Sequence, residues 1–269
     1  MKLNLVPARS GISWIKEGAT TFFRNPLALS STFILFMIVL TVLSVFPLAG
    51  GIAALVLLPG MTLTMMSATR LVAESKLPVP GVIGRALADV RGSTRSLLVL
   101  GLMYGAGYLL IMGISYLIDG GTLARLMLVG EPLSPEAIGA PGFMAATWVT
   151  AILSMPLSLA FWHAPGLLHW YQVPPAKALF FSLVACLRNW KAYALFLLGW
   201  VGVILALNIA VLILGLLLGS IGGGEMVGAV LRTCSTAAML IAGAVFLCSS
   251  YFPPVSYTHL RAHETRGNL

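Results

Sequence analysis

Residues 27–66 read LALSSTFILFMIVLTVLSVFPLAGGIAALVLLPGMTLTMM and contain no charged side chain. An α-helix crosses the hydrocarbon core of a bilayer with about 20 residues, so this run is long enough for two spans. Pro47 and the Gly50–Gly51 pair lie near its middle and predict a tight turn. The stretch therefore predicts a membrane hairpin, with spans at about Leu27–Phe46 and Ile52–Leu71.

The composition of the whole chain is typical of a membrane protein. Of its 269 residues, 59% are apolar and 9% are charged, and the mean hydropathy is +0.97. Soluble domains carry about 25% charged residues, so a soluble enzyme is excluded. Four further apolar runs predict spans at about Ser96–Ile118, Phe143–Phe161, Ala192–Leu214 and Thr233–Phe252. The expected fold class is an all-α integral membrane protein with six transmembrane helices arranged as three hairpins.

Basic residues are concentrated on one side of these spans. Twelve lie before the first span or near the connections that follow the second and fourth: Lys2, Arg9, Lys16, Arg24, Arg70, Lys76, Arg85, Arg91, Arg95, Lys177, Arg188 and Lys191. The connections on the other side contain Arg125 and Arg232, together with four acidic residues. Lys and Arg accumulate in the cytoplasmic segments of membrane proteins, so both termini are expected in the cytoplasm.

The composition changes after Pro254. Residues 255–265 read VSYTHLRAHET, a polar and aperiodic segment that resembles the translation of a transposase-type sequencing adapter. Segments of technical origin are excluded from reasoning about the fold, so His263 and Glu264 are assigned no chemistry. The expected organisation is one six-span membrane domain over residues 1–254, followed by a non-native tail at 255–269.

Each basic segment also contains a short helix-like stretch that is followed by an arginine: Arg24, Arg91 or Arg188. In the first stretch, Ile12, Ile15 and Phe22 share one helical face and are expected to contact acyl chains. Such stretches are typical of helices in the headgroup plane, where an arginine can reach lipid phosphate. We expect three parallel units, each a cytoplasmic interfacial helix followed by a hairpin. Alternatively, the arginines reflect only the cytoplasmic charge bias.

Two stretches resemble one protein family. The first is ARSGISW at residues 8–14, followed by PLAL at 26–29. The second combines FWHAP at 161–165, KALFFSLVAC at 177–186 and RNW at 188–190. Together they are similar to a betaproteobacterial family of polytopic inner-membrane proteins whose function is not known. The resemblance covers about residues 1–252 and implies a bacterial inner membrane without implying an activity.

The segment WHAPGLLHW at residues 162–170 is the most distinctive part of the sequence. Trp162 and Trp170 are typical of the aromatic belt at a membrane surface. His163 and His169 could instead form a pH-sensitive or substrate-facing pair. A metal site is disfavoured, because six residues is not a helical ligand spacing and no carboxylate lies nearby in the sequence.

Polar and helix-breaking residues within the spans bear on transport. Asn208 lies in the middle of the fifth span, where a lone polar group is more often interhelical glue than a transport residue. Pro59, next to Gly60, and Pro156 interrupt the second and fourth spans, and broken helices in matching positions point to transporter sites. The GxxxG spacing at residues 101–105 predicts close helix packing.

Three classes of function remain. The expected one is a non-enzymatic, membrane-embedded scaffold that interacts with lipids or partners, because the spans contain few polar groups. The alternative is a small-solute transporter with a site near Pro59 and Pro156, for which Asn208, His163 and His169 are further candidates. An intramembrane enzyme is disfavoured, since acid–base catalysis requires titratable groups. No cofactor, metal or nucleic acid is expected, and the expected partners are the lipid bilayer and either other membrane proteins or a second copy.

Overall fold

The computed structural model describes residues 5–74, 78–219 and 224–253, where the chain forms twelve α-helices and no strand. Six helical segments are long and apolar enough to cross a membrane: α2 (Pro26–Ser44), α3 (Ala49–Glu74), α5 (Thr94–Asp119), α11 (Trp190–Gly219), α12 (Gly224–Ser249) and the stretch Pro141–Tyr171, which contains α8 (Pro141–Trp162) and α9 (Ala164–Tyr171). The shorter helices are α1 (Ser10–Arg24), α4 (Val79–Gly92), α6 (Thr122–Val129), α7 (Pro135–Gly139), α9 (Ala164–Tyr171) and α10 (Pro175–Arg188). The all-α fold with six membrane-length helices is confirmed. Lys2, Lys76 and the expected tail at 255–269 lie outside the described residues.

The helices follow the expected order of three short helices that each lead into a hairpin. α1 precedes α2 and α3, α4 precedes α5 and α8, and α10 precedes α11 and α12. A single polar residue separates each short helix from the long helix after it: Asn25, Ser93 or Asn189. In the first junction, Ala28 N donates a hydrogen bond to Asn25 Oδ1 at 3.2 Å, which caps the start of α2.

The turn between α2 and α3 differs from the sequence-based prediction. It occupies residues 45–48, so Gly50 and Gly51 lie in the first turn of α3. A Cβ on Gly51 would meet Leu128 O at 2.5 Å, and one on Gly50 would overlap the carbonyl of Leu43. The two glycines therefore allow close contacts with neighbouring backbone instead of forming the turn.

Both prolines that were predicted to interrupt a span lie inside a continuous helix. Pro59 is within α3 and Pro156 is within α8, and neither helix is divided there. The predicted helix breaks are therefore wrong. α3 has 26 residues and α8 has 22, so losing one backbone hydrogen bond at each proline leaves the rest of the helix bonded.

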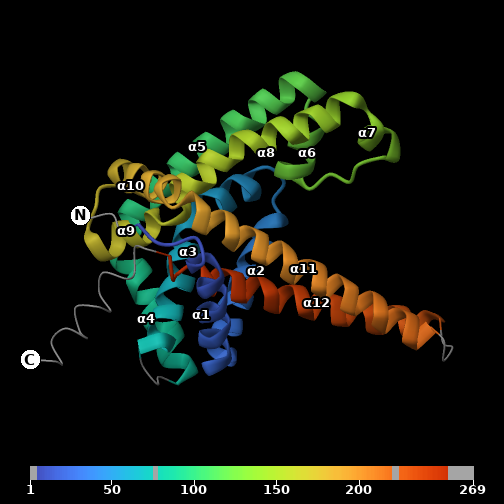
Figure 1. Ribbon diagram of the computed structural model, residues 1–269. Helices are drawn as coiled ribbons and strands as arrows, with labels where there is room; N and C mark the ends of the chain where they lie inside the picture. The colour runs from blue at the N-terminus through green and yellow to red at the C-terminus, as the bar shows by residue number, and fades with distance from the viewer. Residues whose placement is uncertain (1–4, 75–77, 220–223, 254–269) are drawn as a thin grey trace, which may run out of the picture. The chain divides into compact units, whose positions relative to one another are not determined.

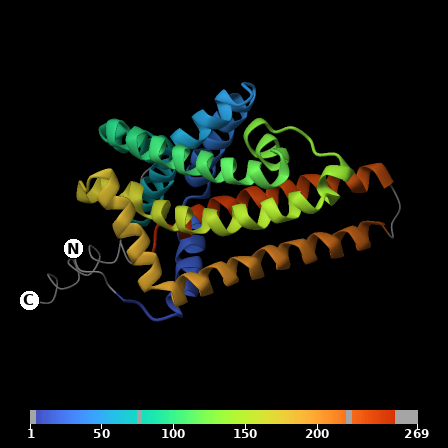
Figure 2. The ribbon, with the colours of Figure 1, turned by 90° about the horizontal axis from the view of Figure 1, so that it is seen from above.

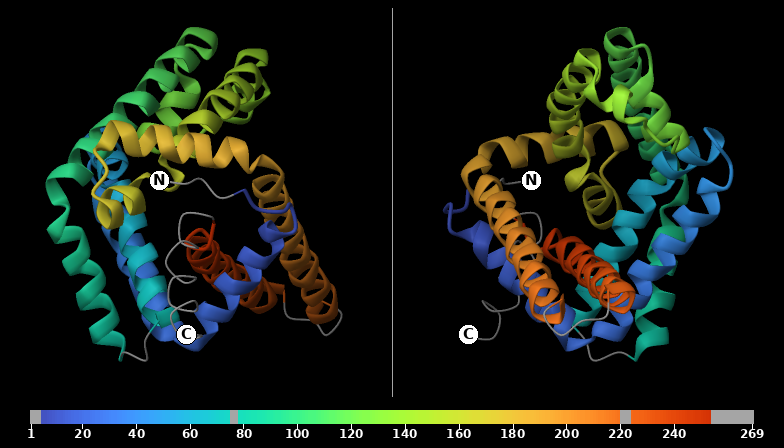
Figure 3. Two further views of the ribbon diagram at one scale, coloured as in Figure 1. Left: turned by 60° about the vertical axis from the view of Figure 1, so that its left-hand side comes forward. Right: turned by 90° about the vertical axis from the view of Figure 1, so that its right-hand side faces the viewer.

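The chain forms two compact units, and the first contains α1, α11 and α12. α11 and α12 form an antiparallel pair, orange and red in both views of Figure 3, and α1 packs against both helices. The buried face of α1 contains Gly11, Trp14, Gly18, Thr21 and Phe22. The ring of Trp14 lies 5.2 Å from that of Tyr193 and 6.1 Å from that of Phe196. Phe22, which was expected to face lipid, is thus buried against protein.

The second unit contains α4 to α10 together with most of α2 and α3. Within it, α5 and α8 are in extensive contact and lie side by side in both Figure 1 and Figure 2. Gly107 of α5 lies where a Cβ would meet Leu157 Cδ1 of α8 at 2.8 Å. A Cβ on Gly101 would overlap the carbonyl of Val56 in α3, and Gly105 is buried nearby. Close packing through the GxxxG spacing is confirmed.

α1, α4 and α10 each contact a hairpin other than the one that they lead into. α1 leads into α2 but contacts α11 and α12. α4 leads into α5, and its Val90 lies 3.8 Å from the Cβ position of Gly60 in α3. α10 leads into α11, and its Ser182 Oγ donates a hydrogen bond to Leu159 O of α8 at 2.8 Å. The three repeats, each a short helix followed by a hairpin, therefore share one pattern of contact as well as one order of helices.

Candidate functional site

Polar side chains of the second unit come together around His169 of α9. Its Nδ1 lies 2.8 Å from Ser93 Oγ at the α4–α5 junction, and its Nε2 lies 3.8 Å from Asp89 Oδ1 of α4. A protonated imidazole would add an ion pair with Asp89 to the hydrogen bond with Ser93. Sequence reasoning singled out His169 but missed both of its neighbours, because Ser93 and His169 are 76 positions apart.

Serine, histidine and aspartate also form hydrolase triads, but the geometry around His169 differs from theirs. In a triad the histidine contacts serine through Nε2 and donates from Nδ1 to the aspartate. Here Ser93 is bonded to Nδ1, and the 3.8 Å separation between Nε2 and Asp89 is too long for a hydrogen bond. The arrangement is suited to holding α9 beside the α4–α5 junction.

His163 occupies the junction between α8 and α9, at the opposite end of α9 from His169. It is 3% exposed, and its backbone N–H donates to Ser182 Oγ at 3.0 Å. Six residues of α-helix advance by about 9 Å, so the two histidines are separated by about this distance along the axis of α9. His163 contacts α10 through its backbone N–H, whereas His169 contacts the end of α4.

The two tryptophans of the same segment are half-buried. Trp162 is the last residue of α8, and Trp170 lies near the end of α9. A Cβ on Gly166 would meet the ring of Trp170 at 2.8 Å, so this glycine makes room for the indole. The ring of Trp170 also lies edge-on to that of His169, with the centroids 6.2 Å apart.

Three arginines occupy equivalent positions at the ends of short helices. Arg24, Arg91 and Arg188 lie in the last turns of α1, α4 and α10, and all three are exposed. Ion pairs within the described ranges join other residues, such as Arg125 with Glu131 at 3.7 Å. An exposed guanidinium can bind phosphate oxygens with two parallel hydrogen bonds. The three arginines thus form a repeated cationic position directly before a span-length helix.

The residues that suggested transport lie in different surroundings. Asn208 is exposed on α11, and its Nδ2 donates to Ile204 O of the same helix at 2.8 Å. Pro156 is exposed on α8, whereas Pro59 is buried in α3. None of these three residues lines an apolar cavity that lies in the second unit, but Gly60, next to Pro59, does.

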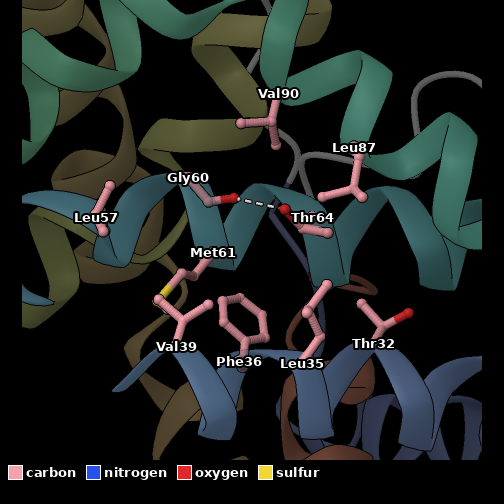
Figure 4. A pocket seen from close by; sticks show the side chains of 10 residues that line it. All are labelled: Thr32, Leu35, Phe36, Val39, Leu57, Gly60, Met61, Thr64, Leu87 and Val90. Atoms are coloured by element: carbon pink, nitrogen blue, oxygen red, sulfur yellow. Dashed lines mark hydrogen bonds between the residues drawn. The ribbon is translucent and has the colours of Figure 1, made fainter. Parts of the chain in front are cut away.

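That cavity is an apolar pocket of about 200 Å³ between α2, α3 and α4. Figure 4 shows Phe36 and Val39 of α2 pointing toward α3, and Val90 of α4 pointing toward it from the other side. One of the few polar groups of the lining is the hydroxyl of Thr64, which donates to Gly60 O at 2.9 Å. Because its hydrogen is bonded to the backbone, the pocket favours an apolar ligand.

Comparison with known proteins supplies a location but no activity. The chain is similar to the probable inner membrane protein BTH_II0599 of Burkholderia thailandensis, with 34% identity over 256 residues. These residues cover 93% of this chain and 92% of the relative. No protein-family model matches the chain, and no solved structure matches it. The similarity and the six apolar helices both indicate a multi-pass inner-membrane protein.

Proposed function

The chain belongs to the inner-membrane protein family of this Burkholderia relative, and we propose that it acts there as a non-enzymatic, lipid-binding scaffold. The observation that carries this proposal is the repeated arginine position. Arg24, Arg91 and Arg188 each lie in the last turn of a short helix, each is exposed, and at most two residues separate each from the span-length helix that follows. A basic side chain near an anionic membrane surface contributes about 1 kcal/mol of binding free energy. Three such positions favour anionic phospholipids around the protein.

A scaffold accounts for the polar groups better than an enzyme does. The Ser93–His169–Asp89 set lacks the triad arrangement, and Ser182 is used in packing α10. Ser182 is itself buried. Catalysis by acid–base chemistry requires titratable groups that can reach a substrate.

The residues within the membrane-length helices also fit a scaffold better than a transporter. Asn208 bonds to its own helix, the prolines do not break α3 or α8, and the pocket beside Gly60 is apolar. Transporter sites at helix breaks instead present freed backbone groups and polar side chains to the solute.

The proposal includes an orientation in which both termini, and with them α1, α4 and α10, lie on the cytoplasmic side. The excess of basic residues in those segments supports this orientation. Partners of the scaffold would be bilayer lipids and either other membrane proteins or a second copy of this chain.

The test of lipid binding is the composition of the lipid that copurifies with the protein. The protein is extracted in lipid nanodiscs from membranes that contain phosphatidylglycerol and phosphatidylethanolamine, and the two lipids are quantified. We expect phosphatidylglycerol to be enriched several-fold over the bulk membrane, and the triple variant Arg24→Gln, Arg91→Gln, Arg188→Gln to lose most of this enrichment. The control is Arg125→Gln, because Arg125 is paired with Glu131 in the acidic connection. Equal enrichment in the triple variant and the wild type would overturn the proposal.

A further inference from the structure

The pocket between α2, α3 and α4 is closed on one side and open on the other. Phe36 and Thr64 are buried at 9% and 6% exposure, whereas Leu57 and Leu87 are 39% and 44% exposed. α2 and α3 are long and apolar enough to cross a membrane, and in a bilayer the open side between them would face hydrocarbon. An occupant that enters from there must be apolar, because polar groups without partners cost several kcal/mol in that environment.

The size of the pocket fits part of a hydrocarbon chain. An apolar cavity of about 150 Å³ stays dry and accepts benzene, and this pocket is larger at about 200 Å³. Gly60 is one of the residues that line this space, and it has no side chain to occupy it. A Cβ at Gly60 would meet only Val90 Cγ1, at 3.8 Å, so the first atom of a side chain fits there, and a larger side chain would extend from it into the region that the pocket occupies.

A positive charge lies on the face of α4 that covers the pocket. Leu87 lines the pocket, and Arg91 follows it by four residues, which places both on one face of the helix. Asp89 lies about 200° around the helix from Leu87 and contacts His169. The acidic side chain of α4 is therefore directed away from the pocket, and Arg91 lies on the same side of α4 as Leu87.

We propose that this pocket binds one acyl chain of an anionic phospholipid whose phosphate pairs with Arg91. The inference rests on the proposed lipid-binding function and specifies one site for it. The apolar lining selects the hydrocarbon chain, and the guanidinium selects the charge of the headgroup. A resident lipid would also join α4 to the α2–α3 hairpin, since its chain would contact all three helices.

The experiment uses photoactivatable lipids in proteoliposomes of the full chain. One probe is phosphatidylglycerol with a diazirine in the middle of an acyl chain, and the other is phosphatidylcholine with the same chain. After irradiation, labelled peptides are quantified by mass spectrometry. We expect peptides that contain residues 32–39 and 57–64 to carry at least fivefold more label from the anionic probe than from the zwitterionic one. Peptides from the exposed face of α11 should label equally with both.

Two substitutions test the pocket and its charge separately. Gly60→Phe should reduce pocket labelling about tenfold, whereas Gly113→Phe should leave it unchanged, because Gly113 is exposed on α5 and has open space around it. Arg91→Gln should make the two probes equal at the pocket. If Gly60→Phe fails to fold, Val90→Phe fills the same space from α4.

The outcomes separate this inference from the function on which it rests. Labelling of residues 32–39 and 57–64 that does not exceed that of α11, or that persists in Gly60→Phe, would overturn the pocket assignment. If phosphatidylglycerol still copurifies with the wild type in that case, the lipid-binding scaffold stands and its site lies elsewhere. If phosphatidylglycerol is not enriched either, both proposals are wrong.

Discussion

Ser93 Oγ lies 2.8 Å from His169 Nδ1, so one hydrogen bond joins the α4–α5 junction to the end of α9. Equivalent junction residues make different contacts. Asn25 caps its own helix α2, and Asn189 Oδ1 accepts a hydrogen bond from Val6 N at 2.9 Å. A polar residue between a short and a long helix is therefore used in two cases to fix a distant segment and in one case to cap the start of the long helix.

The contact between Ser93 and His169 should be measurable as a coupling energy. Ser93→Ala and His169→Ala should each lower the free energy of unfolding by about 1 kcal/mol, the usual net value of one hydrogen bond. In a double-mutant cycle followed by unfolding in detergent, we expect a coupling of about 0.5–1.5 kcal/mol. Thr94→Ala is the control, because Thr94 Oγ1 donates to Val90 O and Arg91 O in α4. A cycle energy near zero for Ser93 and His169 would contradict the contact.

The docking of α1 depends on a glycine. A Cβ on Gly18 would meet Cα of Ser249 at 2.5 Å, so Gly18→Ala must displace α1 from α12. We expect a loss of about 1–3 kcal/mol, typical of overpacking, seen as a lower Tm in detergent. The matched control is Gly84→Ala on α4, which has open space and should be stabilising by up to about 1 kcal/mol. Similar changes at the two positions would argue against a tight α1–α12 contact.

Ser182 should be important for stability. Its Oγ accepts from His163 N and donates to Leu159 O, and the side chain is buried. Ser182→Ala leaves both backbone groups without this partner, and we expect a loss of about 1–3 kcal/mol in a thermal or denaturant unfolding measurement. Ser44→Ala serves as the control, because Ser44 is exposed and bonds only to Thr41 O nearby. An unchanged Tm for Ser182→Ala would show that the Ser182 hydroxyl does not contribute to holding α10 against α8.

Asn208 should be dispensable. It is exposed and bonded to Ile204 O of α11, so Asn208→Leu removes a polar group from a hydrocarbon environment. We expect an equal or higher Tm and unchanged enrichment of phosphatidylglycerol. The comparison with Asn208→Asp is informative, because a carboxylate at that depth should lower the Tm. A strong loss of stability in Asn208→Leu would indicate that the amide bonds to another helix.

The orientation can be tested with paired reporter fusions. Alkaline phosphatase, which is active only in the periplasm, should be active when fused after Gly50 or near Glu131. A fluorescent-protein fusion near Lys177 should fold and fluoresce in the cytoplasm. Two additional fusions lie outside the described residues. The fusion near Lys76 should be cytoplasmic, and the fusion after Gly222 should be periplasmic. Periplasmic phosphatase activity at Lys177 would reverse the proposed topology.

The sequence by itself determined the features that depend on local composition. Runs of apolar residues located all six long helices, since a span is defined by continuous hydropathy over about 20 residues. The positions of Arg24, Arg91 and Arg188 at the ends of short helices also followed from the sequence, because each lies at a local change from polar to apolar residues.

Only the tertiary structure decided which helices pair and what each glycine and polar side chain does. In a membrane, lipid tails are as apolar as leucine, so an apolar face such as that of α1 does not reveal whether it contacts lipid or another helix. For this reason the sequence could not predict that Phe22 is buried against protein, since its position suits a lipid contact equally well. The pocket beside Gly60 and the contact of Ser93 with His169 likewise join segments far apart in the chain. Packing between distant helices, which no local pattern encodes, creates both.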